Sequence, residues 1–91
     1  MWRIDYTDIA ERAILRLDKP VRMRVLGFMR DRVMPAEDPK SLAEPLSGEL
    51  RGLWRFRVGD YRVICDIQTS IRVVQVQDVG HRSDVYRKTG R

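Results

Sequence analysis

Three arginines lie close together in the second half of the chain, and a fourth follows downstream with a tyrosine. Arg55, Arg57 and Arg62 surround a Gly-Asp pair, and Arg82 precedes Tyr86 by a few residues. A guanidinium group is a planar fork of N–H donors that matches the oxygens of a phosphate group. The cluster is therefore typical of a phosphate site, although a solvated basic surface has the same composition.

The pattern around these arginines predicts that they share one surface. Side chains alternate across a strand, so Arg55 and Arg57 point away from the apolar residues between them. If Gly59 and Asp60 form a two-residue hairpin loop, Arg57 lies opposite Arg62. Like charges placed opposite each other are destabilising, so we expect an anion there. The other face carries an apolar row that anchors the hairpin to a core, namely Trp54, Phe56, Val58, Tyr61, Val63, Cys65 and Ile67.

Length and composition are those of a small globular protein. Ninety-one residues predict a single domain over residues 1–91, because smaller pieces would bury too little surface. No apolar run approaches the roughly 20 residues that a membrane-spanning helix needs. The first residues also lack the apolar stretch of a signal peptide. We therefore expect a cytoplasmic protein without a membrane partner.

The positive charge is concentrated in the second half of the chain. Of the net charge of +5, all is contributed by residues 51–91, which hold nine basic and four acidic side chains. Arginine outnumbers lysine fifteen to three, and arginine is the better residue for bidentate phosphate recognition. This half of the chain is therefore expected to carry the surface for an anionic partner.

The sequence holds a single cysteine and a single histidine. Cys65 falls on the apolar row, so we interpret it as a buried small hydrophobe in preference to a reactive thiol. Cys65 and His81 are far apart and offer no metal-ligand spacing. We expect neither a metal nor a cofactor.

The elements that must position the arginines follow from the periodicity. Residues 1–6 alternate as a strand, and a helix starts at Thr7 or Asp8. A second helix begins near Pro20 and stops at Pro35. The proline-rich residues 35–52 are expected to form a loop.

The C-terminal third completes the predicted sheet. The hairpin ends at Ile67, and a further strand over residues 71–79 runs antiparallel to it and brings Arg82 back beside Arg62. The buried face of that strand is ambiguous, because Val73 and Val74 are both apolar. The fold class is α+β: an N-terminal strand, two packed helices, and a three-stranded antiparallel meander that completes a four-stranded sheet, with a short C-terminal helical turn.

Three motifs carry a family resemblance that covers nearly the whole chain. They are Leu50-Arg51-Gly52, the run from Trp54 to Arg57 with Gly59-Asp60-Tyr61-Arg62-Val63, and Val79-Gly80-His81-Arg82-Ser83-Asp84-Val85-Tyr86. With these motifs the chain resembles the RelE/ParE toxin superfamily, and is most similar to its RelE branch. The resemblance implies a ribosome-dependent endoribonuclease that cuts mRNA in the ribosomal A site. It also implies a cognate antitoxin, small, acidic and RelB-like, with DNA contacted only through the toxin–antitoxin complex.

The resemblance also assigns roles to the arginine cluster. The family's basic pair falls on Arg55 and Arg57, its hairpin arginine on Arg62, its post-strand arginine on Arg82 and its C-terminal tyrosine on Tyr86. Metal-free cleavage by the 2′-hydroxyl needs charge stabilisation at the phosphate, which Arg62 and Arg82 would supply. Arg55 would hold the mRNA backbone, and Tyr86 would act as the base, unless it only packs the C-terminal turn.

The proton donor is the open position in this scheme. The family commonly has a lysine in the basic pair, whereas Arg57 cannot readily give up a proton. Either the cation of Arg57 merely stabilises the leaving oxygen, or His81 transfers the proton. The flanking basic residues expected to contact RNA with Arg55 are Arg51, Arg87 and Lys88.

Two other functions fit the same sequence. ParE-type relatives share the fold and act on DNA gyrase without nuclease activity, but they are less similar at the Arg82/Tyr86 ending. A basic binding module that has lost catalysis is the third interpretation.

Overall fold

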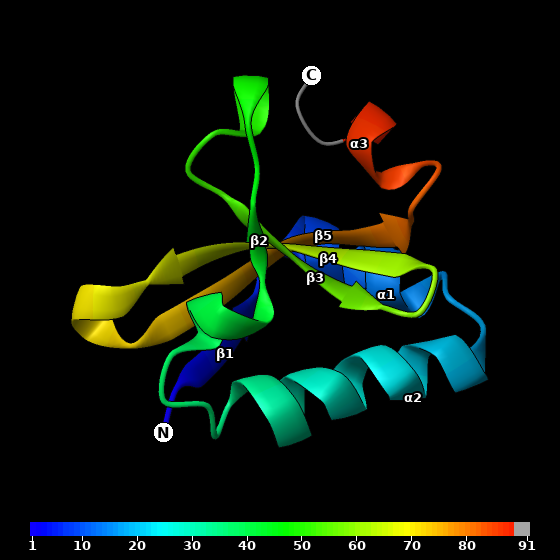
Figure 1. The fold of residues 1–91 in the computed structure, drawn as a ribbon. Helices are drawn as coiled ribbons and strands as arrows, with labels where there is room; N and C mark the ends of the chain where they lie inside the picture. The colour runs from blue at the N-terminus through cyan, green and yellow to red at the C-terminus, as the bar shows by residue number, and fades with distance from the viewer. Residues whose placement is uncertain (89–91) are drawn as a thin grey trace.

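The chain folds into the predicted α+β arrangement of one sheet and two main helices (Figure 1). The structure is a computed structural model, and it describes residues 1–88 except for the side chains of Arg87 and Lys88. The main elements are β1 (Arg3–Tyr6), α1 (Asp8–Leu15), α2 (Lys19–Phe28), β2 (Glu44–Pro45), β3 (Trp54–Val58), β4 (Tyr61–Gln68), β5 (Val73–His81) and α3 (Val85–Lys88).

The sheet has five strands where the sequence predicts four. Its order is β1-β5-β4-β3-β2, with β1 parallel to β5 and the other neighbours antiparallel. The extra strand, β2, lies within residues 35–52, which we expected to be a loop; Glu44 pairs with Arg55 and Pro45 with Trp54. Two residues are too short to show an alternating pattern, and a proline is compatible with an edge strand. The prediction of a purely irregular loop was therefore wrong here.

The helices begin where the sequence predicts. The hydroxyl of Thr7 accepts a hydrogen bond from the N–H of Ala10 at 3.1 Å, which makes Thr7 the N-cap of α1. Pro20 lies in the first turn of α2, and the helix continues through a π-helical turn, η1 (Met29–Val33), just before Pro35. No helix within residues 1–88 is long and apolar enough to cross a membrane.

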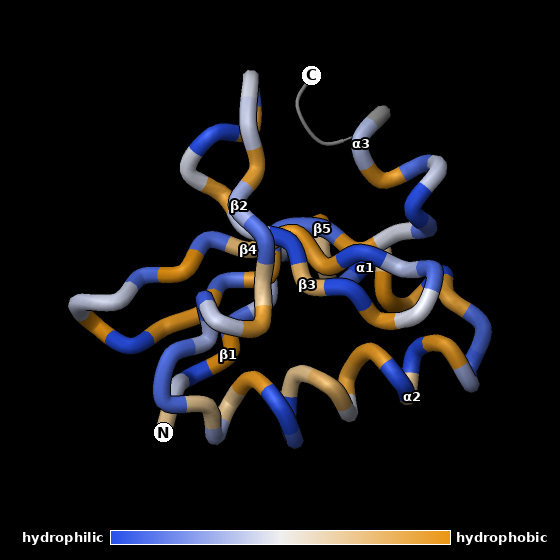
Figure 2. The backbone as a smooth tube through the Cα atoms, viewed as in Figure 1, coloured by the Kyte–Doolittle hydropathy of each residue, from blue (hydrophilic) through white to orange (hydrophobic). Residues whose placement is uncertain are grey.

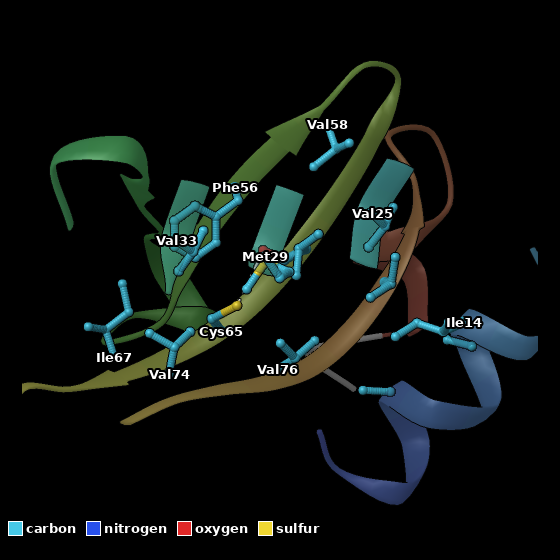
Figure 3. Packing of buried hydrophobic residues seen from close by; sticks show 14 of the residues in the cluster. Ile14, Val25, Met29, Val33, Phe56, Val58, Cys65, Ile67, Val74 and Val76 are labelled. Carbon is cyan, nitrogen blue, oxygen red and sulfur yellow. Dashed lines mark hydrogen bonds between the residues drawn. The ribbon is translucent and has the colours of Figure 1, made fainter. Parts of the chain in front are cut away.

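The main core lies between the helices and one face of the sheet (Figure 3). Along α2, Figure 2 shows hydrophobic residues alternating with hydrophilic ones, as expected for a helix that covers a sheet. The helix layer contributes Val25, Met29 and Val33, all fully buried. Burying one such side chain is worth about 1.5–3 kcal/mol. Of the predicted apolar row, Phe56, Val58, Val63, Cys65 and Ile67 are buried, while Trp54 and Tyr61 are half-buried.

A bulge in β5 decides which of its residues face the helices. Ile64 pairs with Asp78 while the next residue, Cys65, pairs with Val76, so Gln77 is an extra residue without a partner in the ladder. The extra residue reverses the alternation of the strand. Val74 and Val76 therefore face the helices before the bulge, and Val79 and His81 do so after it. Val73, on the other face, is also buried.

The hairpin between β3 and β4 has the predicted register. Arg57 lies opposite Arg62 and Val58 opposite Tyr61, across the two-residue loop Gly59-Asp60. Gly59 has a φ of +59°, the left-handed value that a primed turn requires. The loop thereby fixes which strand residues face the helices and which carry the arginines.

Replacing Gly59 with alanine tests how strongly this loop depends on glycine. A Cβ atom in left-handed backbone costs roughly 1–2 kcal/mol, so we expect Gly59→Ala to lower the free energy of unfolding by about that amount. The added Cβ would also lie 2.6 Å from Nη2 of Arg24, a flexible side-chain end that can move aside. Gly48→Ala is the matched control, because Gly48 has a φ of +64° and no atom within 4 Å of the added Cβ.

Urea denaturation of the two variants provides the measurement. Similar losses of stability are expected for both. An unchanged free energy of unfolding in Gly59→Ala would contradict the assigned turn.

Candidate functional site

The sheet surface that faces away from the helices carries Arg55, Arg57 and Arg62, and we call it the arginine face. The three residues share this face because Arg57 pairs with Arg62 and Arg55 lies two residues before Arg57. In Figure 1, α3 and the loop that contains β2 lie on this side of the sheet, opposite α2. Ile64 pairs with Arg55 and is fully buried, outside the main core, so the arginine face has an apolar floor of its own.

A carboxylate occupies the middle of the arginine face. Oε1 of Glu44 lies 3.0 Å from Nε of Arg55 and 3.0 Å from Nε of Arg57. The hydrogen bond from Arg55, together with the charges of Arg55, Arg57 and Arg62, lowers the pKa of Glu44. The side chain is 48% exposed. It is therefore an ionised anion in contact with water, held by two of the predicted phosphate-binding residues.

The phenol of Tyr86 meets the same cluster from α3. Nη1 of Arg55 donates a hydrogen bond to the Tyr86 hydroxyl oxygen at 2.9 Å. This contact and the hydrogen bond to Glu44 raise the pKa of Arg55. One guanidinium thus binds a phenol and a carboxylate at once, and Arg55 is the residue that links the other two.

The other two arginines of the predicted set lie toward the hairpin loop. Arg62 turns back along its strand, and its Nη1 donates to the carbonyl oxygens of Gly59 and Tyr61, both at 2.9 Å. The backbone N–H of Arg82 donates to the carbonyl of Asp60 at 2.8 Å, and its Nε lies 3.8 Å from Oδ1 of Asp60. Arg62 is close enough to act on the pKa of Glu44, whereas Arg82 is held at the edge of the cluster.

His81 lies on the opposite side of the sheet from the cluster. It pairs with Tyr61, and the two rings meet edge to face with centroids 5.5 Å apart. With Ala13 and Leu17 these rings line a cavity of about 200 Å³ on the helix side. The structure therefore does not bring His81 together with the arginines.

The flanking basic residues differ in what the structure describes. Arg51 is exposed in the turn before β3, where its N–H donates to the carbonyl of Gly48. The side chains of Arg87 and Lys88 lie outside the described residues, so the predicted RNA contacts of these two stay predictions. Cys65 is buried as predicted, and burial raises the pKa of its thiol, which keeps it protonated.

Glu44 is the residue of this site that sequence reasoning missed. The alternation pattern predicted that Arg57 lies opposite Arg62, and therefore that an anion lies between them. We expected this anion to come from a ligand. The chain supplies one itself, from Glu44, which lies eleven residues before Arg55. Its segment contains two short 3-10 helices and the two paired residues of β2. The available signal was weak, because Glu44 is one of four acidic residues in the loop that leads into the basic hairpin, with Glu37, Asp38 and Glu49.

Comparison with known proteins agrees with this fold. A family model described as the ParE toxin of the type II toxin–antitoxin system parDE matches residues 4–86. Toxin RelG of Mycobacterium tuberculosis is 28% identical over 87 residues, covering 96% of this chain and 98% of that protein. Toxin RelE of the same organism is 29% identical over 86 residues, covering 94% of this chain and 87% of that protein.

A solved structure gives the same result at the level of the fold. The toxin–antitoxin complex RelBE2 from Mycobacterium tuberculosis contains a chain that superimposes with a TM-score of 0.81 at 26% identity, covering 89% of this chain and 98% of that one. The family match and the shared fold therefore define a small toxin of a type II toxin–antitoxin system. The chain belongs to the ParE toxin family, within the RelE/ParE superfamily.

The contact between Arg55 and Glu44 predicts a measurable titration. The Glu44 carboxyl should titrate below its ordinary value of 4.5, because protonation would forfeit its hydrogen bond to a cation. Replacing Arg55 with glutamine should move the midpoint back up toward that value. Carbon-detected NMR of the glutamate side chains over a pH series measures both.

Arg51→Gln is the control for the loss of one positive charge, since the pKa of Glu44 is shifted by Arg55, Arg57 and Arg62 and not by Arg51. It should leave the Glu44 midpoint in place. The assigned contact is incorrect if Arg55→Gln and Arg51→Gln shift it equally.

Proposed function

We propose that this toxin is a ribosome-dependent endoribonuclease that cuts mRNA in the ribosomal A site and so inhibits translation. The observation that carries the proposal is the set of contacts around Arg55, which binds Glu44 and Tyr86 at once. Arg57 shares the same carboxylate. A phosphate-binding cation, a proton acceptor and a proton donor thus lie within reach of one another on an accessible surface. Cleavage by the neighbouring 2′-hydroxyl needs these three kinds of group.

The position of Glu44 supports the proposal that a phosphate binds here, because carboxylate and phosphate oxygens accept the same paired hydrogen bonds from guanidinium groups. In the proposed complex an RNA phosphate takes over the donors that Glu44 now uses, and Arg55 holds the RNA backbone. Arg57 and Arg62 then stabilise the charge that develops on the pentacoordinate phosphate. One preorganised donor of this kind is worth roughly 10²–10³-fold in rate.

Arg82 is proposed to join the phosphate from the hairpin side. Its backbone is fixed by the hydrogen bond to Asp60, but its side chain is 63% exposed and its ion pair with Asp60 is long, at 3.8 Å. An exposed pair of this kind contributes little, so the guanidinium can rotate toward a bound anion at small cost.

The two proton transfers are assigned to the two groups that Arg55 binds. Glu44 is ionised at neutral pH, so it can accept the proton of the attacking 2′-hydroxyl. Arg55 donates to the oxygen of Tyr86, so the phenol hydrogen stays available for the departing 5′-oxygen. The products are a 2′,3′-cyclic phosphate and a 5′-hydroxyl. In this division Tyr86 gives a proton, whereas the family resemblance implied that it takes one.

The exposure of the site supports a requirement for the ribosome. Glu44 is 48% exposed and Arg57 60% exposed, so water screens their electrostatic effect in the free toxin. Docking into the A site would exclude that water and hold the codon against the arginine face. This partner implies a cytoplasmic toxin, and binding that weakens with salt because phosphate contacts release counterions.

The proposed regulatory partner is a small, acidic, RelB-like antitoxin. The similar Mycobacterium tuberculosis chain was solved in a toxin–antitoxin complex. An acidic antitoxin segment would neutralise the same arginines that the RNA requires. Any contact with DNA would come through that complex.

Gyrase inhibition is the second candidate, because the matching family model is the one for ParE toxins. A toxin of that kind would inhibit DNA supercoiling and induce a DNA-damage response without cutting mRNA. Purified toxin in a gyrase supercoiling assay distinguishes the two functions.

Cleavage on programmed ribosomes tests the proposed roles. We expect Glu44→Gln and Tyr86→Phe each to lower the single-turnover rate by about 10²–10⁴-fold, the usual contribution of a positioned acid or base. Arg82→Ala should lower it by about 10²–10³-fold. Tyr61→Phe is the matched control for the tyrosine change, since Tyr61 lies on the helix side of the sheet, and it should cleave normally. Primer extension on reporter mRNA measures each rate and maps the cut within the A-site codon.

Growth arrest by the wild-type toxin without new mRNA ends would rule out the nuclease. Normal cleavage by Glu44→Gln would remove Glu44 from the mechanism and leave the base to another group.

A further inference from the structure

The turn between β5 and α3 decides where Tyr86 lies. Two backbone hydrogen bonds shape this turn, from the N–H of Arg82 to the carbonyl of Asp60 at 2.8 Å and from the N–H of Asp84 to the carbonyl of His81 at 2.9 Å. Figure 1 shows the chain changing direction here as it leaves β5 for α3. A helix of four residues cannot hold its own direction, so the turn has to do so.

The imidazole of His81 closes this turn from the helix side. The backbone N–H of Ser83 donates to Nδ1 at 3.2 Å, and the hydroxyl oxygen of Ser83 lies 2.8 Å from the same atom. An acceptor that reaches the N–H two residues further on is the arrangement by which Asn and Asp side chains form turns. The contact with the Tyr61 ring holds the imidazole in place.

From this turn, α3 is seated directly on the sheet. Val85 is 1% exposed, and a Cβ added to Gly80 would lie 3.2 Å from the Cβ of Val85. There is no room for a side chain between them, so the two backbones lie close together. The next residue, Tyr86, then reaches Arg55 at 2.9 Å.

We infer that His81 is a positioning residue, whose Nδ1 holds the β5–α3 turn so that the phenol of Tyr86 meets Arg55. Its effect on catalysis rests on the proposed function, while its effect on the turn does not. His81 pairs with Tyr61 on the helix side, across the sheet from the arginine face, so its ring acts through the backbone and not on the RNA. Because Nδ1 accepts from an amide, the ring hydrogen of the neutral imidazole is on Nε2.

Asparagine and alanine at this position separate positioning from proton transfer. His81→Asn keeps an acceptor, Oδ1, at the same number of bonds from the backbone as Nδ1, but cannot serve as an acid or a base. His81→Ala removes the acceptor. Hydrogen exchange of the Arg82 and Asp84 amides, followed by NMR in the free toxin, reports the turn, and single-turnover cleavage on programmed ribosomes reports the reaction.

In His81→Ala we expect the protection of these two amides to fall about tenfold, the equivalent of one lost hydrogen bond, with a cleavage rate reduced at least as much. His81→Asn should keep wild-type protection and cleave within about threefold of wild type. The inference is overturned if His81→Asn keeps the protection but is as inactive as His81→Ala, since His81 would then be the proton donor. It is also overturned if His81→Ala keeps its protection, or if His81→Asn loses it. Should the wild type fail to cut mRNA, the proposed nuclease fails, and amide exchange still decides the role of His81 in the turn.

Discussion

The arginine face depends on one electrostatic constraint, the need for an anion between cations that the sheet forces together. Arg57 and Arg62 are direct partners in the β3–β4 ladder, and Arg55 lies one step along the same face. Like charges in such positions repel. This repulsion is offset by Glu44, which forms ion pairs with Arg55 and Arg57, and by backbone carbonyls, which accept hydrogen bonds from the guanidinium of Arg62. The cations are thus kept in place without a ligand, and each of them keeps donors that an incoming phosphate can use.

The rest of the molecule serves to hold that face in one register. The side of the sheet that meets α1 and α2 is packed with fully buried residues such as Phe56 and Val63, so a slip of one residue would move a core side chain into water. The bulge at Gln77 adds a second requirement. It reverses the alternation of β5, which lets Val79 and His81 join the helix side while Gly80 comes opposite Arg62. The absence of a side chain on Gly80 is what admits Val85, and with it α3, to the arginine face.

Local patterns in the sequence predicted the hairpin, and long-range pairing explains what they did not predict. The register of Arg57 with Arg62 follows from two neighbouring facts, alternation and a Gly-Asp loop, so it could be read without knowing the fold. The contact between Arg55 and Tyr86 joins residues 31 apart in the chain, and its existence depends on how α3 is seated. The side of the sheet that His81 faces depends on one extra residue in the ladder, Gln77. The alternation of hydrophobic residues in the sequence does not reveal such a bulge. Glu44 was missed for a similar reason, since β2 exists only through its pairing with β3.

The same constraint connects the exposed site to the proposed dependence on the ribosome. Two unit charges 4 Å apart interact by about 1 kcal/mol in bulk water and by about 4 kcal/mol at the effective dielectric constant of a partly enclosed protein surface. In the free toxin the cluster is open to water, with Arg57 and Arg82 each about 60% exposed. Under the proposed function its hold on an RNA phosphate would therefore be weak, and Glu44 would compete for the same donors. A partner that covers the face would strengthen each proposed guanidinium–phosphate contact several-fold without any change in the protein. Under the proposed function, the ribosome would thus supply the exclusion of water that an ordinary nuclease obtains from its own cleft, and the internal carboxylate would keep the uncovered toxin from binding RNA indiscriminately.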